Sequence, residues 1–237
     1  MDIMDIITNA ISYPIENLKA LLIYLVLGLV LGLVMGITGV GTVLSSETST
    51  LMAFIVAVIG VIIAILISFL IQGYGLDIIK LGIRRSNASP EIDFQRQVTN
   101  GVKLFVVSVV YLIIPVVITA LLSLIFRDWI ISIIGVILFV LFYFALAMGQ
   151  CRLAKSEDLS IALDVQSAID DLFNIGVLKV IITVILVMLI MLIINTIFGL
   201  IFEVIFNEAI VSALMGVINV YLTFFSYRAM GLLYSEI

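Results

Sequence analysis

The densest group of side chains that could do chemistry lies between Glu157 and Asp171. Carboxylates of this kind bind divalent cations or act as general acids and bases, and the group consists of Glu157, Asp158, Asp164, Asp170 and Asp171. Helical spacing scatters them around one exposed face of a helix, where charged side chains are normally solvated. We therefore interpret the group as a solvated face and predict neither catalytic residues nor a metal site.

The composition limits the chemistry further. The chain has no histidine and a single cysteine, Cys151, so histidine-based catalysis, haem ligation, thiolate zinc sites and intramolecular disulfides lack their residues. A net charge of −5 does not provide the broad basic surface that attracts nucleic acid. We predict a non-enzymatic protein with no cofactor and no nucleic-acid partner.

The chain is far more apolar than a water-soluble domain. Apolar residues make up 64% of its 237 residues and charged residues only 11%, where about 25% charge is usual. Runs long enough to cross a membrane are Ala20 to Leu44, Leu51 to Ile71, Val102 to Phe126, Trp129 to Gly149, Leu178 to Phe202 and Ala209 to Tyr227. Their unbroken apolar character favours helices over barrel strands. The sequence predicts an all-α, polytopic integral membrane protein with six transmembrane helices in one domain, residues 1–237.

The basic residues predict how the chain is oriented. Three connections between the spans are short: Ser45 to Thr50, the Arg127–Asp128 corner, and Glu203 to Glu208. Two are long, Leu76 to Gly101 and Gln150 to Val177, and ten of the eleven Lys and Arg residues lie on their side, the exception being Arg127. Because basic residues near span ends stay in the cytoplasm, we expect both termini to be cytoplasmic in a cell membrane. The acidic start at Asp2 and Asp5 argues against a cleaved signal peptide.

Amphipathic patterns precede the odd-numbered spans. Asp158 to Asn174 carries Ala162, Val165, Ile169, Leu172 and Phe173 at helical spacing. A similar stripe near the start of the chain is Ile3, Ile6, Ile7, Ala10 and Ile11, and a weaker one is Phe94, Val98 and Val102, after a possible helix start at Ser89-Pro90. We predict three transmembrane hairpins, each preceded by a cytoplasmic amphipathic interfacial helix. Whether these helices lie on lipid or enter the bundle is left open by the pattern.

The same pattern suggests internal repeats. Lys19, Lys103 and Lys179 each stand at the mouth of an odd-numbered span, and each even-numbered span ends near a glycine: Gly75, Gly149 and Gly231. Repeats over residues 1–75, 90–149 and 158–231 fit these positions. Chance similarity among apolar segments is the alternative interpretation.

The first half of the chain carries residues of a known family. They are Gly73-Tyr74-Gly75-Leu76-Asp77-Ile78-Ile79-Lys80, then Pro90-Glu91-Ile92-Asp93-Phe94 and Gly101-Val102-Lys103, with Tyr13-Pro14 ahead of Asn17-Leu18-Lys19. The chain resembles the multi-pass, chiefly archaeal membrane proteins grouped as the domain of unknown function DUF4013. This resemblance implies an integral protein of archaeal or bacterial cell membranes and carries over no catalytic residue. Asp77 departs from the family pattern, which tends to place a basic residue there.

Small and polar residues inside the spans mark candidate packing sites. Gly28, Gly32 and Gly36 share one helix face, which suits close packing on another helix of the chain or a dimer interface. Asn195 and Asn219 are carboxamides at membrane depth that suit hydrogen bonds to neighbouring helices, or alternatively a substrate pathway. Pro115 should kink its helix, either for packing or as a hinge.

Lys80, Arg84 and Arg85 form a basic cluster beside a span end. Such a cluster enforces topology or binds anionic lipid headgroups. We keep these three residues as headgroup candidates.

Three function classes remain to be compared. A non-enzymatic scaffold, assembly or lipid-organising protein explains a membrane interior without titratable residues. A transporter or channel for a small neutral or lipophilic solute is the alternative, although coupled carriers usually place ionisable residues inside the membrane. An intramembrane enzyme would need residues that the composition withholds. We favour the first class, with membrane lipids and a homo-oligomer or membrane-protein partner as expected contacts.

Overall fold

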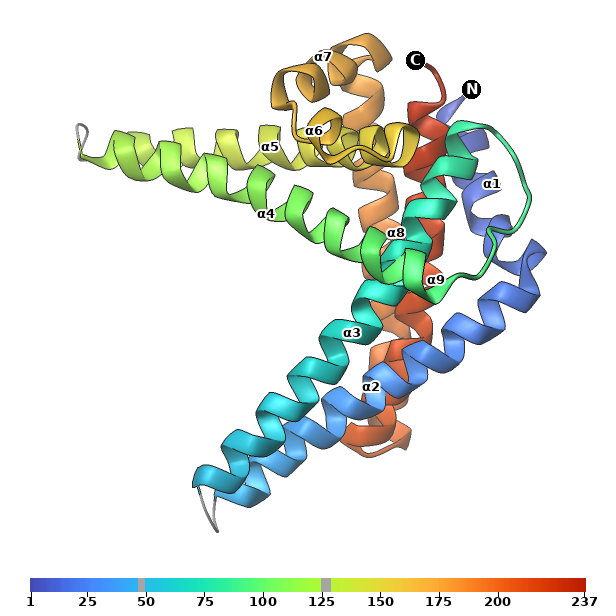
Figure 1. Ribbon diagram of the computed structural model, residues 1–237, viewed down its shortest axis with the longest axis vertical. Helices are drawn as coiled ribbons and strands as arrows, with labels where there is room; N and C mark the ends of the chain where they lie inside the picture. Colours follow the sequence, from blue (N-terminus) through green and yellow to red (C-terminus); the bar gives the residue numbers. More distant parts are fainter. Residues whose placement is uncertain (47–49, 125–128) are drawn as a thin grey trace.

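The computed structural model describes residues 1–46, 50–124 and 129–237, and within them the chain is all-α, as predicted. Figure 1 shows the arrangement of the helices. The helices are α1 (Ile3–Glu16), α2 (Leu18–Ser46), α3 (Thr50–Ile83), α4 (Phe94–Ser123), α5 (Trp129–Ser156), α6 (Leu159–Ala162), α7 (Val165–Ile175), α8 (Val177–Ile205) and α9 (Glu208–Tyr234).

Six of these helices are long and apolar enough to cross a membrane: α2, α3, α4, α5, α8 and α9. This agrees with the predicted spans, but the helices are longer than the apolar runs. α3 continues past Ile71 to Ile83, and α4 begins at Phe94 instead of Val102. The extra turns carry charged residues. The helices can continue through them because helical backbone hydrogen bonds do not depend on apolar side chains.

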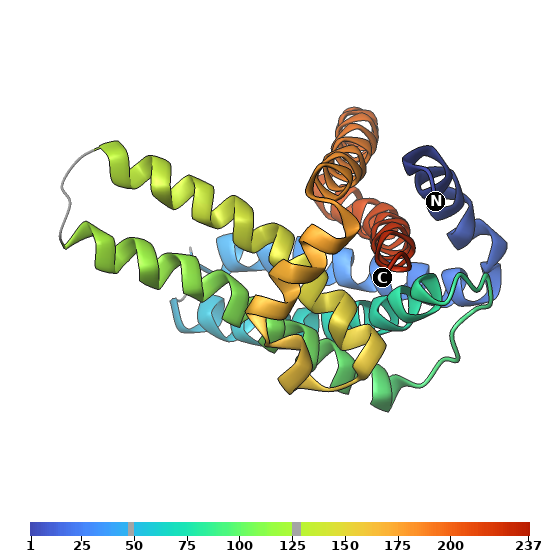
Figure 2. The same cartoon turned by 90° about the horizontal axis from the view of Figure 1, so that it is seen from above.

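The long helices lie in three pairs that diverge from a common body (Figure 1). α2 packs along α3, α4 along α5, and α8 along α9. Seen from above, the α8–α9 pair is viewed nearly end-on while α4 and α5 extend sideways (Figure 2). Both termini lie at the common body. We call this body the hub; it consists of α1, α6, α7, the last turns of α3, α5 and α9, and the first turns of α4 and α8.

The apolar core is concentrated in the hub. Leu76, Ile79, Met148, Leu153 and Leu233 are almost completely buried there. Far from the hub, large apolar side chains are exposed: Phe54 by 65%, Leu192 by 62% and Val204 by 88%. In water, apolar surface on this scale would promote aggregation, whereas in lipid its exposure carries no such cost.

The amphipathic segments differ from the prediction in two places. The predicted single helix from Asp158 to Asn174 is divided into α6 and α7, because Asp158 caps α6 and Asp164 caps α7 by accepting a hydrogen bond from the backbone N–H of Ser167 at 3.1 Å.

The weaker stripe with Phe94 and Val102 does not form a separate helix and belongs to α4, with both residues exposed. The helix start predicted at Ser89-Pro90 is also wrong. Asp93 is the actual cap, since its carboxylate accepts from the Arg96 N–H at 3.1 Å.

Two of the predicted short connections fall on residues 47–49 and 125–128, outside the described residues. They are Ser45 to Thr50 and the Arg127–Asp128 corner. The third, Glu203 to Glu208, shortens to a link at Phe206 and Asn207, since α8 continues to Ile205 and Asn207 caps α9.

The contact between α2 and α9 is unusually close. A Cβ atom added to Gly28 would lie 2.5 Å from the carbonyl oxygen of Gly216, and one added to Gly32 would lie 2.0 Å from that of Ser212. Gly36 faces Ala209 of the same helix. The glycine stripe therefore packs on a helix of the same chain, where missing side chains allow the two backbones to meet.

Gly32→Ala tests this contact. The added methyl group would overlap the α9 backbone, so we expect the free energy of unfolding to fall by about 1–3 kcal/mol, measured from the thermal midpoint in detergent micelles. Gly199→Ala in α8 is the control, because a Cβ there meets nothing within 4 Å. A Gly32→Ala protein as stable as the wild type would contradict the packing.

Candidate functional site

Four of the five acidic residues between Glu157 and Asp171 have structural partners, and Asp170 is exposed. Glu157 pairs with Lys80, Asp158 and Asp164 are helix caps, and Asp171 accepts a hydrogen bond from Arg152 Nη1 at 2.8 Å. Among the described residues, no group of three or more such side chains is arranged to hold a metal ion.

Hydrogen bonds keep these exposed carboxylates ionised. The hydrogen bond from Lys80 lowers the pKa of Glu157, and the bonds from Ser160 lower the pKa of Asp158. The hydroxyl of Ser167 lowers the pKa of Asp164 in the same way. A carboxylate with a lowered pKa is a poor general acid or base near neutral pH.

The predicted basic cluster is separated in the fold. Lys80 pairs with Glu157, while the Nε of Arg85 donates to Ser235 Oγ at 3.0 Å near the C-terminus. Arg84 is exposed, and its side chain makes no hydrogen bond or ion pair within the described part of the chain. Of the three headgroup candidates, only Arg84 therefore has an uncommitted cationic group.

A polar cleft of about 380 Å³ surrounds Lys80 at the edge of the hub. Arg96 pairs with Asp77 at 3.2 Å, and Lys103 Nζ donates to the backbone carbonyl oxygen of Glu157 at 2.9 Å. The cleft is lined by three acidic and three basic side chains, namely Asp77, Lys80, Asp93, Arg96, Lys103 and Glu157. These charges balance, so the cleft has no net attraction for an anion or a cation.

Among the described residues, the most deeply buried charged side chain is Arg228 of α9, which is 0% exposed. Its guanidinium donates to Asn9 Oδ1 at 3.0 Å, to the Ser86 carbonyl oxygen at 2.7 Å and to Asn87 Oδ1 at 2.5 Å. The Tyr13 ring lies 4.4 Å from the guanidinium carbon, within the range of a cation–π contact. Arg228 thus joins α9 to α1 and to the connection between α3 and α4.

The same connection is held by a second set of hydrogen bonds. Tyr13 Oη donates to the Ala88 carbonyl oxygen at 2.9 Å, and Asn17 Nδ2 donates to the Asn87 carbonyl oxygen at 3.4 Å. Burial raises the pKa of Tyr13, which keeps its hydroxyl protonated as a donor. The sequence showed Arg228 only as one of ten basic residues on the predicted cytoplasmic side.

The C-terminal residues are fixed to the hub by ion pairs. Lys179 Nζ lies 2.6 Å from Glu236 Oε1. Burial alone would raise the pKa of Glu236. Hydrogen bonds such as the one from Lys179 outweigh burial, so the pKa is lowered. Tyr234 Oη donates to Asp171 Oδ2 at 2.6 Å. These contacts join side chains that are far apart in the sequence and hold the C-terminal residues against the hub.

The predicted packing residues in the spans have different surroundings. Asn195 Nδ2 donates to the Met191 carbonyl oxygen at 3.0 Å on its own helix, so the expected bond to a neighbouring helix is absent at this residue. Asn219 is exposed, and its carboxamide has no hydrogen bond to the described residues. Pro115 is buried inside α4, which continues through it.

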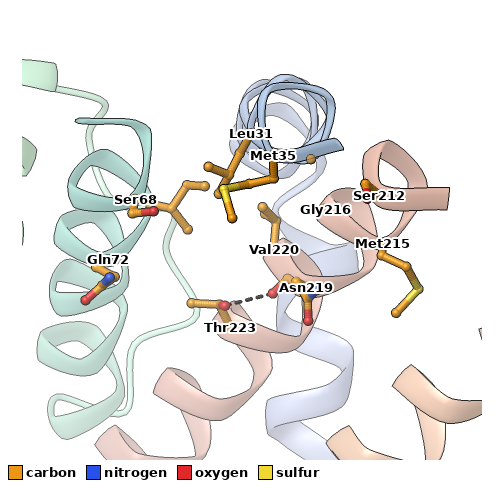
Figure 3. A pocket seen from close by; sticks show the side chains of 12 residues that line it. Leu31, Met35, Ser68, Gln72, Ser212, Met215, Gly216, Asn219, Val220 and Thr223 are labelled. Atoms are coloured by element: carbon orange, nitrogen blue, oxygen red, sulfur yellow. Dashed lines mark hydrogen bonds between the residues drawn. The ribbon is translucent and has the colours of Figure 1, made fainter. Parts of the chain in front are cut away.

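Asn219 lines a lateral cavity of about 380 Å³ between α2, α3 and α9. We call it the groove; its lining is Leu31, Gly32, Met35, Ser68, Ile71, Gln72, Ser212, Met215, Gly216, Asn219, Val220 and Thr223. Figure 3 shows Leu31 and Met35 of α2 between Ser68 of α3 and Val220 of α9. The sequence does contain a signal for this polar lining, because Ser212, Asn219 and Thr223 recur at helical spacing on one face of an apolar helix.

The comparisons with known proteins give a family. The model of a family described as "Protein of unknown function (DUF4013)" matches residues 56–206, more than half of the chain. The match contains the Gly73-to-Lys80 motif but leaves out α1, α2 and α9. No curated protein and no solved structure matches the chain.

Replacing Arg228 tests whether it holds the hub together. Arg228→Met leaves the oxygens of Asn9, Ser86 and Asn87 without their buried donor, so we expect the free energy of unfolding to fall by at least about 2 kcal/mol. Hydrogen exchange at residues 86–93 should accelerate, because that connection loses its anchor.

Arg84→Met is the matched control, since Arg84 lies beside the same connection but is exposed. It should change stability by no more than about 0.5 kcal/mol. Equal exchange rates in the two variants would show that Arg228 does not anchor the connection.

Proposed function

The chain belongs to the DUF4013 family, as its sequence predicts, and we propose that it is a non-enzymatic multi-pass membrane scaffold that organises lipid around a cytoplasmic hub. The observation that carries the proposal is the division of the molecule into a buried hub and long helices with exposed apolar side chains. The hub has a closed apolar core held by polar contacts, and the long helices that leave it expose apolar side chains. A hub at the membrane surface with helices in hydrocarbon satisfies both parts.

The charge distribution supports a cytoplasmic hub. Ten of the eleven Lys and Arg residues belong to the hub side, and Lys80, Lys103, Arg152 and Lys179 make hydrogen bonds or ion pairs there. Basic residues near span ends are retained in the cytoplasm. In this orientation the three helix pairs are transmembrane hairpins, and both termini are cytoplasmic.

α1 supports contact between the hub and lipid, because it has two apolar faces. Ile6, Ile7 and Ala10 are buried against the hub. Met4, Ile11 and Ile15 are exposed by 65%, 40% and 56%, at a spacing that places them along one other side of the helix. An interfacial helix uses such a face to enter the boundary between headgroups and acyl chains. We therefore infer that one face of α1 packs on protein and that the other lies against lipid.

The engagement of the hub's charges supports a non-enzymatic role. Glu157, Asp158, Asp164 and Glu236 act in helix caps or ion pairs, and the pKa of each of these four carboxyl groups is lowered. Enzymes instead hold a catalytic group near its working pKa in a cleft.

One observation favours the alternative of a carrier for a small neutral or lipophilic solute. The groove is lined by Asn219, a residue expected on such a pathway. Asn195 and Pro115, which were expected beside it, do not line the groove. We therefore retain the scaffold as the main proposal.

Cysteine labelling tests the orientation. In a Cys151→Ala background, Arg84→Cys should react with a membrane-impermeant maleimide only after the cells are opened, because Arg84 lies on the hub. Glu203→Cys, near the α8–α9 link, should react in intact cells. The reverse pattern, or labelling of both from one side, would contradict the orientation.

Spin labels test the lipid contact of α1. In vesicles, a label at Ile15→Cys should be more accessible to oxygen than to a polar nickel chelate, because the side chain faces the apolar phase. Glu16→Cys is the matched control, since Glu16 is the exposed polar neighbour and its label should favour the nickel chelate. Equal accessibility at both positions would refute an interfacial α1.

A further inference from the structure

The groove has an uncharged polar lining within helices that are otherwise apolar. Ser68 and Gln72 of α3 face the same space as Ser212, Asn219 and Thr223 of α9, and none of its lining residues is acidic or basic. Apolar side chains, including Met35 and Val220, complete the walls. This mixture suits a ligand that is mainly apolar, with one or two neutral hydrogen-bonding groups.

The carboxamides in the groove have unused hydrogen-bonding capacity. Thr223 Oγ1 donates to the Asn219 backbone carbonyl oxygen at 2.7 Å and is satisfied on its own helix (Figure 3). The side chains of Gln72 and Asn219 make no hydrogen bond to any described residue. We call the parts of the six long helices outside the hub the arms. With the arms in hydrocarbon, an unpaired amide on them is costly because no water is there to bond it. A bound partner with an uncharged donor or acceptor removes that cost.

The shape of the groove suits a flexible chain. Its volume is about 380 Å³. A neighbouring space of about 690 Å³ shares Leu31, Met35, Ser68 and Gln72 and extends to Phe105 of α4. Methionine side chains adapt to irregular apolar ligands. A single hydrocarbon chain can follow both spaces.

We propose that the groove binds one apolar chain of a neutral membrane amphiphile, whose uncharged hydroxyl and ester groups bond to the carboxamides of Gln72 and Asn219. The proposal rests on the proposed function, because the groove faces hydrocarbon only if the arms cross the membrane. It adds a ligand class to that function: a lipid held laterally between α2, α3 and α9. A charged headgroup is disfavoured inside the groove because the lining offers no opposite charge.

Photolabelling in nanodiscs tests the proposal. The probe is 1-oleoylglycerol carrying a diazirine in its acyl chain, competed with unlabelled 1-oleoylglycerol or with oleate. We expect labelled peptides from α3 and α9, with 1-oleoylglycerol competing at least about tenfold better than oleate. Gln72→Leu with Asn219→Leu should weaken competition by 1-oleoylglycerol about tenfold, since two hydrogen bonds are lost.

Asn195→Leu is the matched control, because it removes a carboxamide of another membrane-spanning helix that is already bonded within that helix. Its competition curve should match that of the wild type. Ser68→Phe, which fills the groove without removing a carboxamide, should abolish labelling of α9. Equal competition by oleate, an unchanged double variant, or crosslinking between two copies through Met35→Cys would overturn the proposal.

The Arg84→Cys and Glu203→Cys labelling pattern is measured on the same preparations. If that pattern holds while the groove variants have no effect, the lipid site is wrong and the membrane orientation stands. If the labelling pattern itself fails, the proposed function falls first.

Discussion

The buried guanidinium of Arg228 is the interaction on which the hub depends. A desolvated cation must have its donors satisfied, and here neutral oxygens from α1 and from residues 86–87 do so in place of a carboxylate. Those partners lie 219, 142 and 141 residues away in the sequence. Each of these oxygens accepts from the guanidinium in only one position. The need to satisfy the guanidinium donors therefore holds α1 and the α3–α4 connection against the end of α9. Tyr13 and Asn17 then add bonds that are possible only in this arrangement.

Fixing the hub leaves the arms free to be stabilised in another way. Within the hub, apolar burial and polar contacts act together, as in a water-soluble domain. Along the arms, buried apolar residues form a smaller cluster between α2, α3 and α9, and α2 and α9 also meet in close backbone contact, as between Gly28 and Gly216. The two parts therefore suit different surroundings. The hub has its buried core where the helices leave hydrocarbon, and the arms have their exposed apolar surface where the helices lie within it.

The sequence predicted features that depend on local composition and missed those that depend on distant partners. Six apolar runs, the all-α class and the family followed from residues near one another. Lys80, Arg84 and Arg85 are adjacent in sequence, yet Lys80 turns to Glu157 and Arg85 to Ser235, because partner positions are set by tertiary packing. The break between α6 and α7 was missed for a different reason: Asp164 was interpreted as part of a helix face, although an aspartate preceding Ser167 also suits a cap.

α9 connects the two parts of the molecule. Its last turns carry Arg228 in the hub, its middle lines the groove through Asn219 and Thr223, and its first half packs on the glycine stripe of α2. A shift of α9 that widens the groove must therefore also strain the contacts of Arg228 or separate Gly32 from Ser212. Both contacts resist the shift, one by the cost of unpaired buried polar groups and the other by lost packing. A groove bounded on one side by so constrained a helix resists widening on that side, which suits the thin apolar chain that we propose as its ligand.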